Sequence, residues 1–448
     1  MIGFRGRDQL EREEDRRLAP YAIRSTEAER RHPALADQET DDRLAFQRDR
    51  DRILHARAFR RLKHKTQVFV PHTADHPRTR LTHTLEVGQL SRTVARSLGL
   101  NEDLVEAIAM GHDLGHTAFG HTGETVLDEI LHGRDRQPIL PETVVAEAGA
   151  FKHNYQSLRV VDLLERRYAR PGLNLTDQVR EGILKHTRWK TTFPFPLPDR
   201  EGLRLDAPCH LEGQAVAVGD EIAQQTHDLE DGLRAGSIRL ATVERLPAVR
   251  RVIATVGVAW DQEERSWRRQ NLIIRGLIRL FVTDVTGTAT RRLRRHAERH
   301  GLGDDRDAWR ERADELGQTT IWFSSEVEDL FGELKAFIYR RVINHQGVNR
   351  QDWRARKVVS ALFAAFWTNP LTLPDYVLLR ARDELGMPYL RDLPFDDVAG
   401  EITARYHTSA GFARLVVDHI AGMSDRYALE EYGSLEQPTL HEPREDVR

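Results

Sequence analysis

The chain has 448 residues, of which 40% are hydrophobic and 31% charged, a composition that indicates a folded globular protein and excludes disorder as the default. Its 67 basic and 70 acidic residues give a formal charge of −3, which excludes the uniformly basic surface of a dedicated nucleic-acid or membrane binder. Cys209 is the only cysteine, so an intrachain disulfide is excluded and a reducing, cytoplasmic location is expected.

Apolar residues recur at intervals of three and four through most of the chain, which predicts an all-α protein. The charged ends, residues 1–18 and 434–448, are predicted to be mobile. Between them we predict a metal-binding catalytic core over residues 19–235 and a C-terminal helical region over residues 236–433 packed on it. A hydrophobic core shared across residue 235 remains as consistent with the sequence as two separate domains.

The longest apolar stretch, residues 358–367, is about half as long as a membrane-spanning helix, so it predicts a buried helix or an oligomer contact. We expect no membrane association.

Two predicted helices carry polar side chains on their apolar faces. Burying an imidazole or carboxylate there without a partner would destabilise the fold by about 2 to 7 kcal/mol. In the helix that begins at Thr82, His83 continues the apolar face. In the next helix, His112 follows Leu104 and Ile108 at four-residue spacing, and Asp113 comes next. Helical spacing therefore predicts that His83 and His112 point inward near acidic groups.

A third helix is predicted over residues 211–229. Its apolar stripe is formed by Ala215, Val218, Gly219, Ile222 and Ala223. Asp220, Gln224 and Asp228 make a neighbouring stripe at four-residue spacing. Two imidazoles and two carboxylates would suit a divalent transition metal such as Mn, Fe or Zn, with positions left open for water and substrate. Magnesium on a phosphate substrate would be a separate ion.

The densest local signal is the segment 111–121, Gly-His-Asp-Leu-Gly-His-Thr-Ala-Phe-Gly-His, with Glu124 following it. Gly115 and Gly120 are expected to turn the backbone sharply, so that His116, His121 and Glu124 can face the metal. An imidazole beside a carboxylate can transfer a proton near neutral pH.

These motifs resemble the HD-domain deoxynucleoside triphosphate triphosphohydrolases, including the bacterial dGTPase-like proteins. The resemblance covers most of the chain. Its stretches are residues 46–52 (FQRDRDR), 59–62 (FRRL), 65–69 (KTQVF), 80–87 (RLTHTLEV), the histidine-rich segment, and 220–223 (DEIA).

The resemblance implies a metal held by four ligands: His83, His112, Asp113 and Asp220. It also implies a catalytic pair of His121 and Glu124, with His116 and His153 beside the triphosphate. The residues that it places on the substrate are Gln67, Arg80 and Asp228, the last near the sugar or triphosphate end.

The implied reaction is hydrolysis of a dNTP to a deoxynucleoside and inorganic triphosphate. Water activated by the metal would attack the α-phosphorus, and His121, steadied by Glu124, would protonate the departing 5′ oxygen. The chain departs from the family at Gln224 and Ile343, where relatives often carry tyrosines that contact the sugar. These departures leave the preferred nucleotide open.

Two other functions stay open from the sequence. A phosphomonoesterase or phosphodiesterase could use the same metal beside histidine and arginine. A non-catalytic nucleotide or nucleic-acid sensor could use the same cleft, although a pure binder does not need the acid pair His121 and Glu124.

Three basic clusters are expected to be solvated surface. They lie at residues 60–65, 291–295 and 354–357. The alternatives are a contact with single-stranded nucleic acid and, as in several relatives, a second site for an activating dNTP between the subunits of a homo-oligomer.

Overall fold

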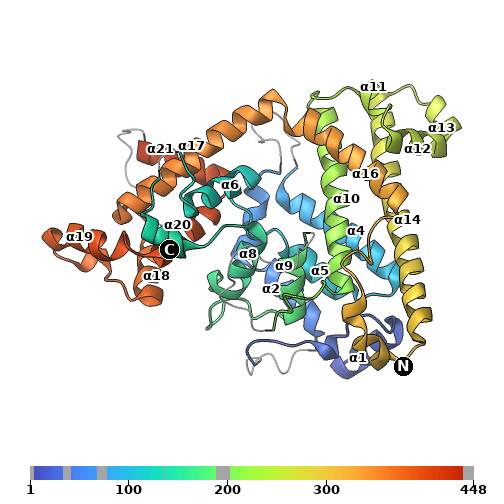
Figure 1. Ribbon diagram of the computed structural model, residues 1–448, viewed down its shortest axis with the longest axis horizontal. Coiled ribbons are helices and arrows are strands. Elements are labelled where there is room, and N and C mark those ends of the chain that lie inside the picture. The colour runs from blue at the N-terminus through green and yellow to red at the C-terminus, as the bar shows by residue number, and fades with distance from the viewer. Residues whose placement is uncertain (1–4, 34–41, 68–77, 137, 188–201, 437–448) are drawn as a thin grey trace. The chain divides into compact units, whose positions relative to one another are not determined.

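The computed structural model describes residues 5–33, 42–67, 78–136, 138–187 and 202–436. The regular structure within these ranges is helical, and β pairing there is confined to isolated bridges such as that between Arg30 and Thr176. The predicted all-α class is therefore confirmed (Figure 1).

The longer elements begin with α1 (Arg7–Arg17), α2 (Ala45–Leu54), α3 (Arg57–Arg61), α4 (Arg80–Leu98), α5 (Glu102–Gly111), α6 (Gly120–Leu131), α7 (Glu142–Ala148), α8 (His153–Arg159), the π-helix η5 (Val160–Leu164), α9 (Asp177–Lys185) and α10 (Leu211–Arg234). They continue with α11 (Leu240–Val243), α12 (Pro247–Val256), α13 (Val258–Asp261), α14 (Ser266–His300), α15 (Arg306–Glu311), α16 (Ser325–Ile338) and the π-helix η7 (Tyr339–Ile343). The last are α17 (Gln346–Thr368), α18 (Asp375–Leu385), α19 (Phe395–Glu401), the π-helix η10 (Ile402–Tyr406), α20 (Ala410–Ala421) and α21 (Asp425–Glu436).

The chain forms two compact units that are not contiguous in sequence. Unit 1 consists of Met1–Lys63, Gln67–Gly115 and His153–Asn349. Unit 2 consists of His64–Thr66, His116–Lys152 and Arg350–Arg448. The division falls between Gly115 and His116, inside the histidine-rich segment 111–121 that the sequence analysis considers a single motif.

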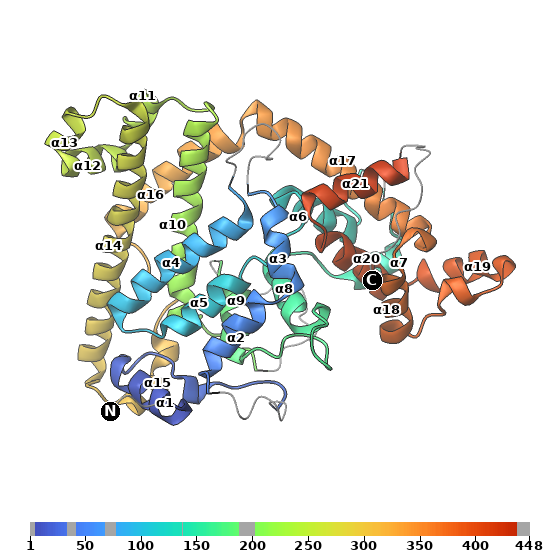
Figure 2. The ribbon, with the colours of Figure 1, turned by 180° about the vertical axis from the view of Figure 1, so that it is seen from behind.

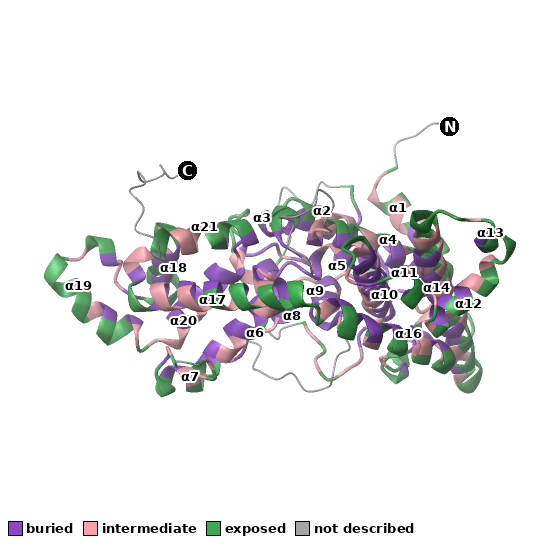
Figure 3. Ribbon diagram, turned by 90° about the horizontal axis from the view of Figure 1, so that it is seen from above, coloured by how far each residue is buried: buried purple, intermediate pink, exposed green. Residues whose placement is uncertain are grey.

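Helices α4, α5 and α10 pack against one another in unit 1 (Figures 1 and 2). The Thr79 side chain caps α4 by accepting a hydrogen bond from the Thr82 amide, and the left-handed Gly99 ends the helix. The Asn101 side chain caps α5 in the same way through Asp103 and Leu104. Much of α5 and α10 is buried (Figure 3), so both helices present side chains to the interior along most of their length.

Small residues allow these helices to approach closely. A Cβ atom added at Gly219 of α10 would lie 2.2 Å from the Ser91 hydroxyl oxygen on α4. A Cβ at Gly182 of α9 would lie 2.4 Å from Ile108 Cδ1 on α5. Both distances are shorter than any van der Waals contact, so a larger side chain at either glycine would push the helices apart.

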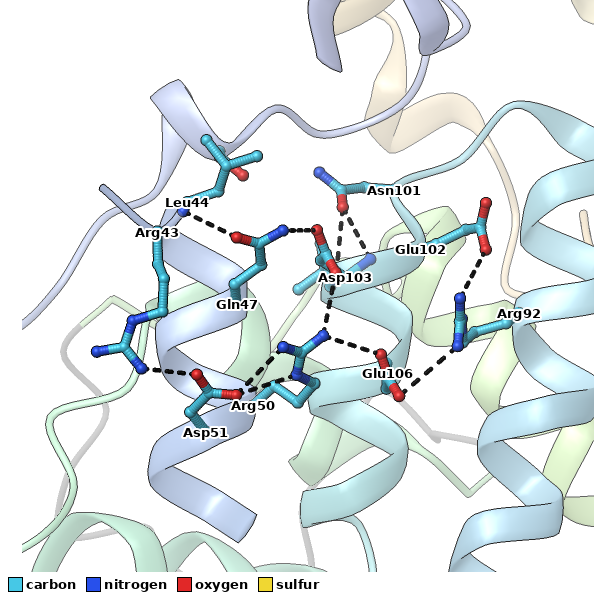
Figure 4. Close-up of polar contacts among 12 residues, drawn as sticks. Arg43, Leu44, Gln47, Arg50, Asp51, Arg92, Asn101, Glu102, Asp103 and Glu106 are labelled. Atoms are coloured by element: carbon cyan, nitrogen blue, oxygen red, sulfur yellow. Dashed lines mark hydrogen bonds and ion pairs between the residues drawn. The ribbon is translucent and has the colours of Figure 1, made fainter. Parts of the chain in front are cut away.

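A polar network joins α2 to α5 (Figure 4). The Gln47 side chain donates to Asp103 over 2.9 Å and accepts from the Leu44 amide over 3.2 Å. Arg50 Nη1 lies 3.2 Å from Glu106 Oε2. Part of the family-like stretch at residues 46–52 is therefore committed to holding these two helices together.

The N-terminal segment differs from the expectation of mobility over residues 1–18. Residues 7–17 form α1, in which the Glu14 carboxylate is buried. It accepts hydrogen bonds from the Ser25 amide over 2.7 Å, the Ser25 hydroxyl over 2.8 Å and the Asn101 side chain over 2.9 Å. The buried Glu14 carboxylate thus holds this helix against the rest of the unit. The sequence prediction of mobility looked only for an apolar face and therefore missed this contact. At the other end, α21 includes residues 434–436, and the rest of the predicted mobile tail, 437–448, lies outside the described residues.

The predicted boundary near residue 235 lies within unit 1, where α10 packs on α14. This packing agrees with the alternative prediction, in which one hydrophobic core continues across residue 235. The assignment of catalysis to residues 19–235 stays a prediction.

Unit 2 has its own hydrophobic core, to which α6, α7, α17, α18 and α20 contribute. The apolar stretch at residues 358–367 lies in α17, and Leu362, Phe363 and Phe366 are fully buried there. Among the described residues, no helix is long and apolar enough to cross a membrane.

Candidate metal centre

Three helices of unit 1 bring His83, His112 and Asp220 together. His83 comes from the first turn of α4, His112 is the residue that caps the end of α5, and Asp220 lies in the middle of α10. His83 Nε2 lies 2.9 Å from Asp220 Oδ1, and His112 Nε2 lies 3.8 Å from the same oxygen. The donor atoms of all three lie within 4.8 Å of one another, so three of the four predicted ligands converge.

The fourth predicted ligand, Asp113, adjoins this group. Its Oδ1 lies 3.4 Å from His112 Nε2, and its Oδ2 accepts a hydrogen bond from Arg80 Nη1 over 2.7 Å. Both Asp113 and Arg80 are buried. The ion pair holds the carboxylate beside His112 and offsets its charge.

Hydrogen bonds fix the chemical state of His112. Its Nδ1 lies 2.6 Å from the Ala109 carbonyl oxygen, which can only accept, so Nδ1 carries a hydrogen. Nε2 then presents a lone pair, and this buried atom has no hydrogen-bond partner among the described residues. A buried lone pair facing carboxylates is what a metal ligand requires.

The His83 ring is oriented by a second histidine, His227, on α10. His227 Nε2 lies 2.5 Å from Glu86 Oε2, which places a hydrogen on that nitrogen and leaves Nδ1 as an acceptor. His227 Nδ1 lies 3.2 Å from His83 Nδ1, which therefore donates. His83 Nε2 is left facing the Asp220 carboxylate, an arrangement that needs a positive charge, either a second ring proton or a metal ion, between the two atoms.

The titration behaviour of these groups agrees with a cation site. Burial alone would raise the pKa of Asp220, but the His83 hydrogen bond and the nearby His112 lower it to about 2. Burial lowers the pKa of His227 to about 4, against the opposing effect of Glu86. Asp220 is therefore ionised and His227 neutral near pH 7. Neutral imidazoles and ionised carboxylates are the donor set of Mn, Fe and Zn sites.

The sequence prediction missed His227 and His186. His227 lies seven residues after Asp220, two turns along the same face of α10, which was an available signal. His186 caps the end of α9 and is buried, and its ring lies 5.1 Å from that of His112 and 5.4 Å from that of the predicted His153.

The remaining predicted catalytic residues lie in unit 2. The rings of His116 and His121 pack edge to face with centroids 5.2 Å apart. The donor atoms of His116, His121 and Glu124 lie within 4.8 Å of one another. His121 is exposed, whereas Glu124 is buried and forms an ion pair with Lys152. The segment 116–124 therefore places two imidazoles and a carboxylate together.

The two glycines of the histidine-rich segment have different roles. Gly120 has a positive φ of 58°, which agrees with the expected turn. Gly115 is required instead by close packing. A Cβ there would lie 2.1 Å from the Ser157 amide nitrogen and 2.4 Å from the His153 carbonyl oxygen.

The predicted substrate residues in unit 1 are polar and at least partly buried. Gln67 Oε1 and Asp228 Oδ1 are both buried and accept no hydrogen bond within the described ranges. Burial, reinforced by repulsion from Asp231, raises the pKa of Asp228 to about 8. Its carboxyl group is therefore largely protonated at pH 7 and can donate a hydrogen bond. Gln224 lies half-buried on α10, four residues after Asp220, and Ile343 ends the π-helix η7.

Comparison with known proteins assigns these elements to one family. Residues 80–224 match the HD domain, and residues 321–400 and 387–434 match the phosphohydrolase-associated domain. The HD match spans α4 to α9 and continues into α10 as far as Gln224, and so contains His83, His112, Asp113 and Asp220.

Several relatives that align with most of this chain share one name. A deoxyguanosinetriphosphate triphosphohydrolase-like protein of Azorhizobium caulinodans is 40% identical over 89% of this chain and 92% of its own length. Proteins of that name from Geobacter sulfurreducens and Bordetella pertussis are 37% and 40% identical, over 98% and 93% of this chain and 99% and 96% of their own lengths. The chain therefore belongs to the deoxyguanosinetriphosphate triphosphohydrolase-like family of HD-domain phosphohydrolases.

Proposed function

We propose that the protein hydrolyses deoxynucleoside triphosphates to the deoxynucleoside and inorganic triphosphate in a metal-dependent reaction. The observation that supports this most directly is the buried His112 Nε2, which faces Asp113 and Asp220 with no hydrogen-bond partner among the described residues. The names of the full-length relatives supply the substrate class.

The proposed ligands are His83, His112, Asp113 and Asp220. A divalent metal held there would lower the pKa of a bound water toward about 7 and so supply the nucleophile at the α-phosphorus. The Arg80 guanidinium keeps Asp113 in place and adds positive charge next to it, which favours a phosphate group.

The other proposed roles divide between proton transfer and binding. His121 would protonate the 5′ oxygen as its bond to phosphorus breaks, with Glu124 orienting it and His116 and His153 contacting the triphosphate. The protonated Asp228 carboxyl would donate to a sugar hydroxyl or a phosphate oxygen, and Gln67 would hydrogen-bond to the substrate.

Product analysis tests the proposal. The metal-free protein is reloaded with Mn²⁺ and incubated with each dNTP, singly and in mixtures, in ¹⁸O-labelled water. We expect unlabelled deoxynucleoside and labelled triphosphate, because attack at the α-phosphorus puts the water oxygen on the triphosphate. Asp220→Asn should lose the activity. Stepwise release of orthophosphate would instead identify a phosphomonoesterase, and no product from any mixture would favour a sensor.

A further inference from the structure

One buried carboxylate in unit 2 connects its own helix to two segments that are far away in the sequence. Asp425 is the first residue of α21, and it is only 6% exposed. Its Oδ2 accepts hydrogen bonds from the Thr66 amide over 2.9 Å and from the Thr66 hydroxyl. Its Oδ1 accepts a hydrogen bond from the Phe119 amide over 2.8 Å. Thr66, Phe119 and Asp425 all belong to unit 2, so these contacts lie within one unit.

The cap of α21 is made by another residue. The Ser424 side chain accepts a hydrogen bond from the Tyr427 amide over 3.3 Å, as a helix cap does. The Asp425 carboxylate bonds instead to segments outside α21, and these N–H and O–H donors stabilise it in its buried position. The two donors of Thr66 share one carboxylate oxygen and so fix the orientation of the group, which leaves the other oxygen facing Phe119.

A buried lysine beside Thr66 makes a second connection between the same segments. Lys65 Nζ donates to the carbonyl oxygens of His116 and Ala421, the latter over 3.0 Å. Ala421 is the last residue of α20 and lies four residues before Asp425. The loop 116–119 is therefore held at its first residue by Lys65 and at its last residue by Asp425.

The backbone that Asp425 holds has an unusual conformation. Phe119 has a φ of 61° and a ψ of 23°, in the left-handed region, which is unfavourable for a residue with a Cβ atom. Such a conformation persists where the surrounding structure holds it. Phe119 immediately precedes α6, whose second residue is His121 and whose fifth is Glu124. The hydrogen bond from Phe119 to Asp425 therefore fixes the point from which α6 presents these two side chains.

We propose that Asp425 is a positioning residue for the proposed proton donor: it holds Phe119 in the left-handed conformation and so orients His121 toward the departing 5′ oxygen. This inference rests on the proposed function, in which His121 protonates that oxygen. A proton donor acts as the bond to phosphorus breaks, so its misplacement lowers kcat. Binding of Mn²⁺ should stay unchanged, because the four proposed ligands belong to unit 1.

Two substrates distinguish a positioning role from a general loss of structure. The first is the dNTP that the wild type hydrolyses fastest, and the second is the same nucleotide with sulfur in place of the bridging 5′ oxygen. A thiolate is a weaker base than an alkoxide and leaves without a proton, so turnover of the sulfur analogue does not need His121. His121→Ala should accordingly lose turnover of the dNTP and keep turnover of the analogue.

Asp425→Asn preserves the size of the side chain and leaves one acceptor oxygen, which cannot serve Thr66 and Phe119 together. We expect its kcat with the dNTP to fall by about 10- to 100-fold, while its kcat with the sulfur analogue stays near that of the wild type. Thr66→Val, which removes only the hydroxyl bond, should show the same pattern with a smaller loss. This second variant keeps the test valid if Asp425→Asn does not fold.

A control and a measurement independent of catalysis complete the experiment. Asp397→Asn, the same substitution at an exposed position of α19, should match the wild type with both substrates. Hydrogen–deuterium exchange reports on the loop directly. The amides of residues 116–124 should exchange faster in Asp425→Asn than in the wild type and at the wild-type rate in Asp397→Asn.

The outcomes separate this inference from the proposed function. An active wild type together with unchanged kcat in Asp425→Asn, equal losses with the two substrates, or unchanged exchange of residues 116–124 would overturn the positioning role and leave the proposed function intact. A wild type that turns over neither the dNTP nor the analogue would overturn the proposed function, and the positioning role with it.

Discussion

His83 Nδ1 lies 3.2 Å from His227 Nδ1, and the other nitrogen of His83 faces Asp220 at 2.9 Å. The His83 side chain on α4 thus contacts two residues of α10, one of which is the proposed metal ligand Asp220. Because His227 also lies 2.5 Å from Glu86, a carboxylate fixes the orientation of a ring that in turn orients a ligand.

Replacing His227 should therefore weaken metal binding without removing a ligand. His227→Phe removes the acceptor for His83 Nδ1, and we expect the dissociation constant for Mn²⁺ to rise by about 10- to 100-fold. Competition with a fluorescent chelator measures this constant. His227→Gln retains an acceptor oxygen and should recover part of the affinity. Equal affinity in the wild type and His227→Phe would show that the contact has no orienting role.

The proposed role of His121 as proton donor can be tested separately from metal binding. His121→Ala should abolish turnover of dNTP while the Mn²⁺ content stays near that of the wild type, because the proposed ligands are untouched. Turnover is followed by deoxynucleoside release and metal content by elemental mass spectrometry. His132→Ala, at the exposed end of the same helix, should be fully active. An active His121→Ala protein would exclude this residue as the proton donor.

The raised pKa of Asp228 predicts a dependence of stability on pH. A carboxyl that titrates near 8 when folded and near 4 when unfolded binds its proton more tightly in the folded state. The stabilisation that Asp228 contributes to the free energy of unfolding is therefore lost progressively as pH rises from about 4 to about 8. In Asp228→Asn this loss should be smaller by about 2 to 4 kcal/mol between pH 5 and pH 8.

Urea denaturation of the metal-free protein at the two pH values measures the difference. Asp329→Asn makes the same substitution at an exposed position of α16 and should leave the pH profile of the wild type unchanged. Parallel profiles for the wild type and Asp228→Asn would show that Asp228 titrates normally.

The packing of Gly115 predicts a large cost for a single methyl group. Its Cβ would meet the backbone of Ser157 and His153, which cannot rotate away as a side chain can. We expect Gly115→Ala to lower the free energy of unfolding by at least about 2 kcal/mol. Gly332→Ala on α16, where a Cβ meets nothing within 4 Å, should instead raise it by up to about 1 kcal/mol. Thermal or urea melts compare the two, and a neutral Gly115→Ala would contradict the packing.

Periodicity located the helices and their inward faces well, because burial imposes a repeat on the sequence. The faces that carry His83 on α4 and Asp220 on α10 could be identified in this way. His186 could not, since it stands alone at the end of α9 and only the fold brings that end to His112. The docking of α1 was missed for a related reason, because it depends on one buried acid, Glu14, with distant partners.

The division into two units also could not be predicted from the sequence pattern. Segment 116–152 packs with residues 350 and beyond, which are far away in the sequence, while the adjoining His112 and Asp113 pack in unit 1. Local composition gives no sign of such a change of partner within one motif. The family resemblance supplied Asp220 as the final ligand, which helical spacing left undecided.

The ends of α5 and α9 have a consequence for the order of binding. His112 and His186 cap these helices, and their rings lie 5.1 Å apart, so two helix C-termini meet at one point. The aligned peptide dipoles of a helix give its C-terminus about half a negative charge, which attracts cations and repels anions. The two helix ends therefore favour a cation at this place in unit 1. For the proposed reaction we expect the metal to bind before the nucleotide, because the cation offsets the negative charge of the helix ends and of the ligand carboxylates.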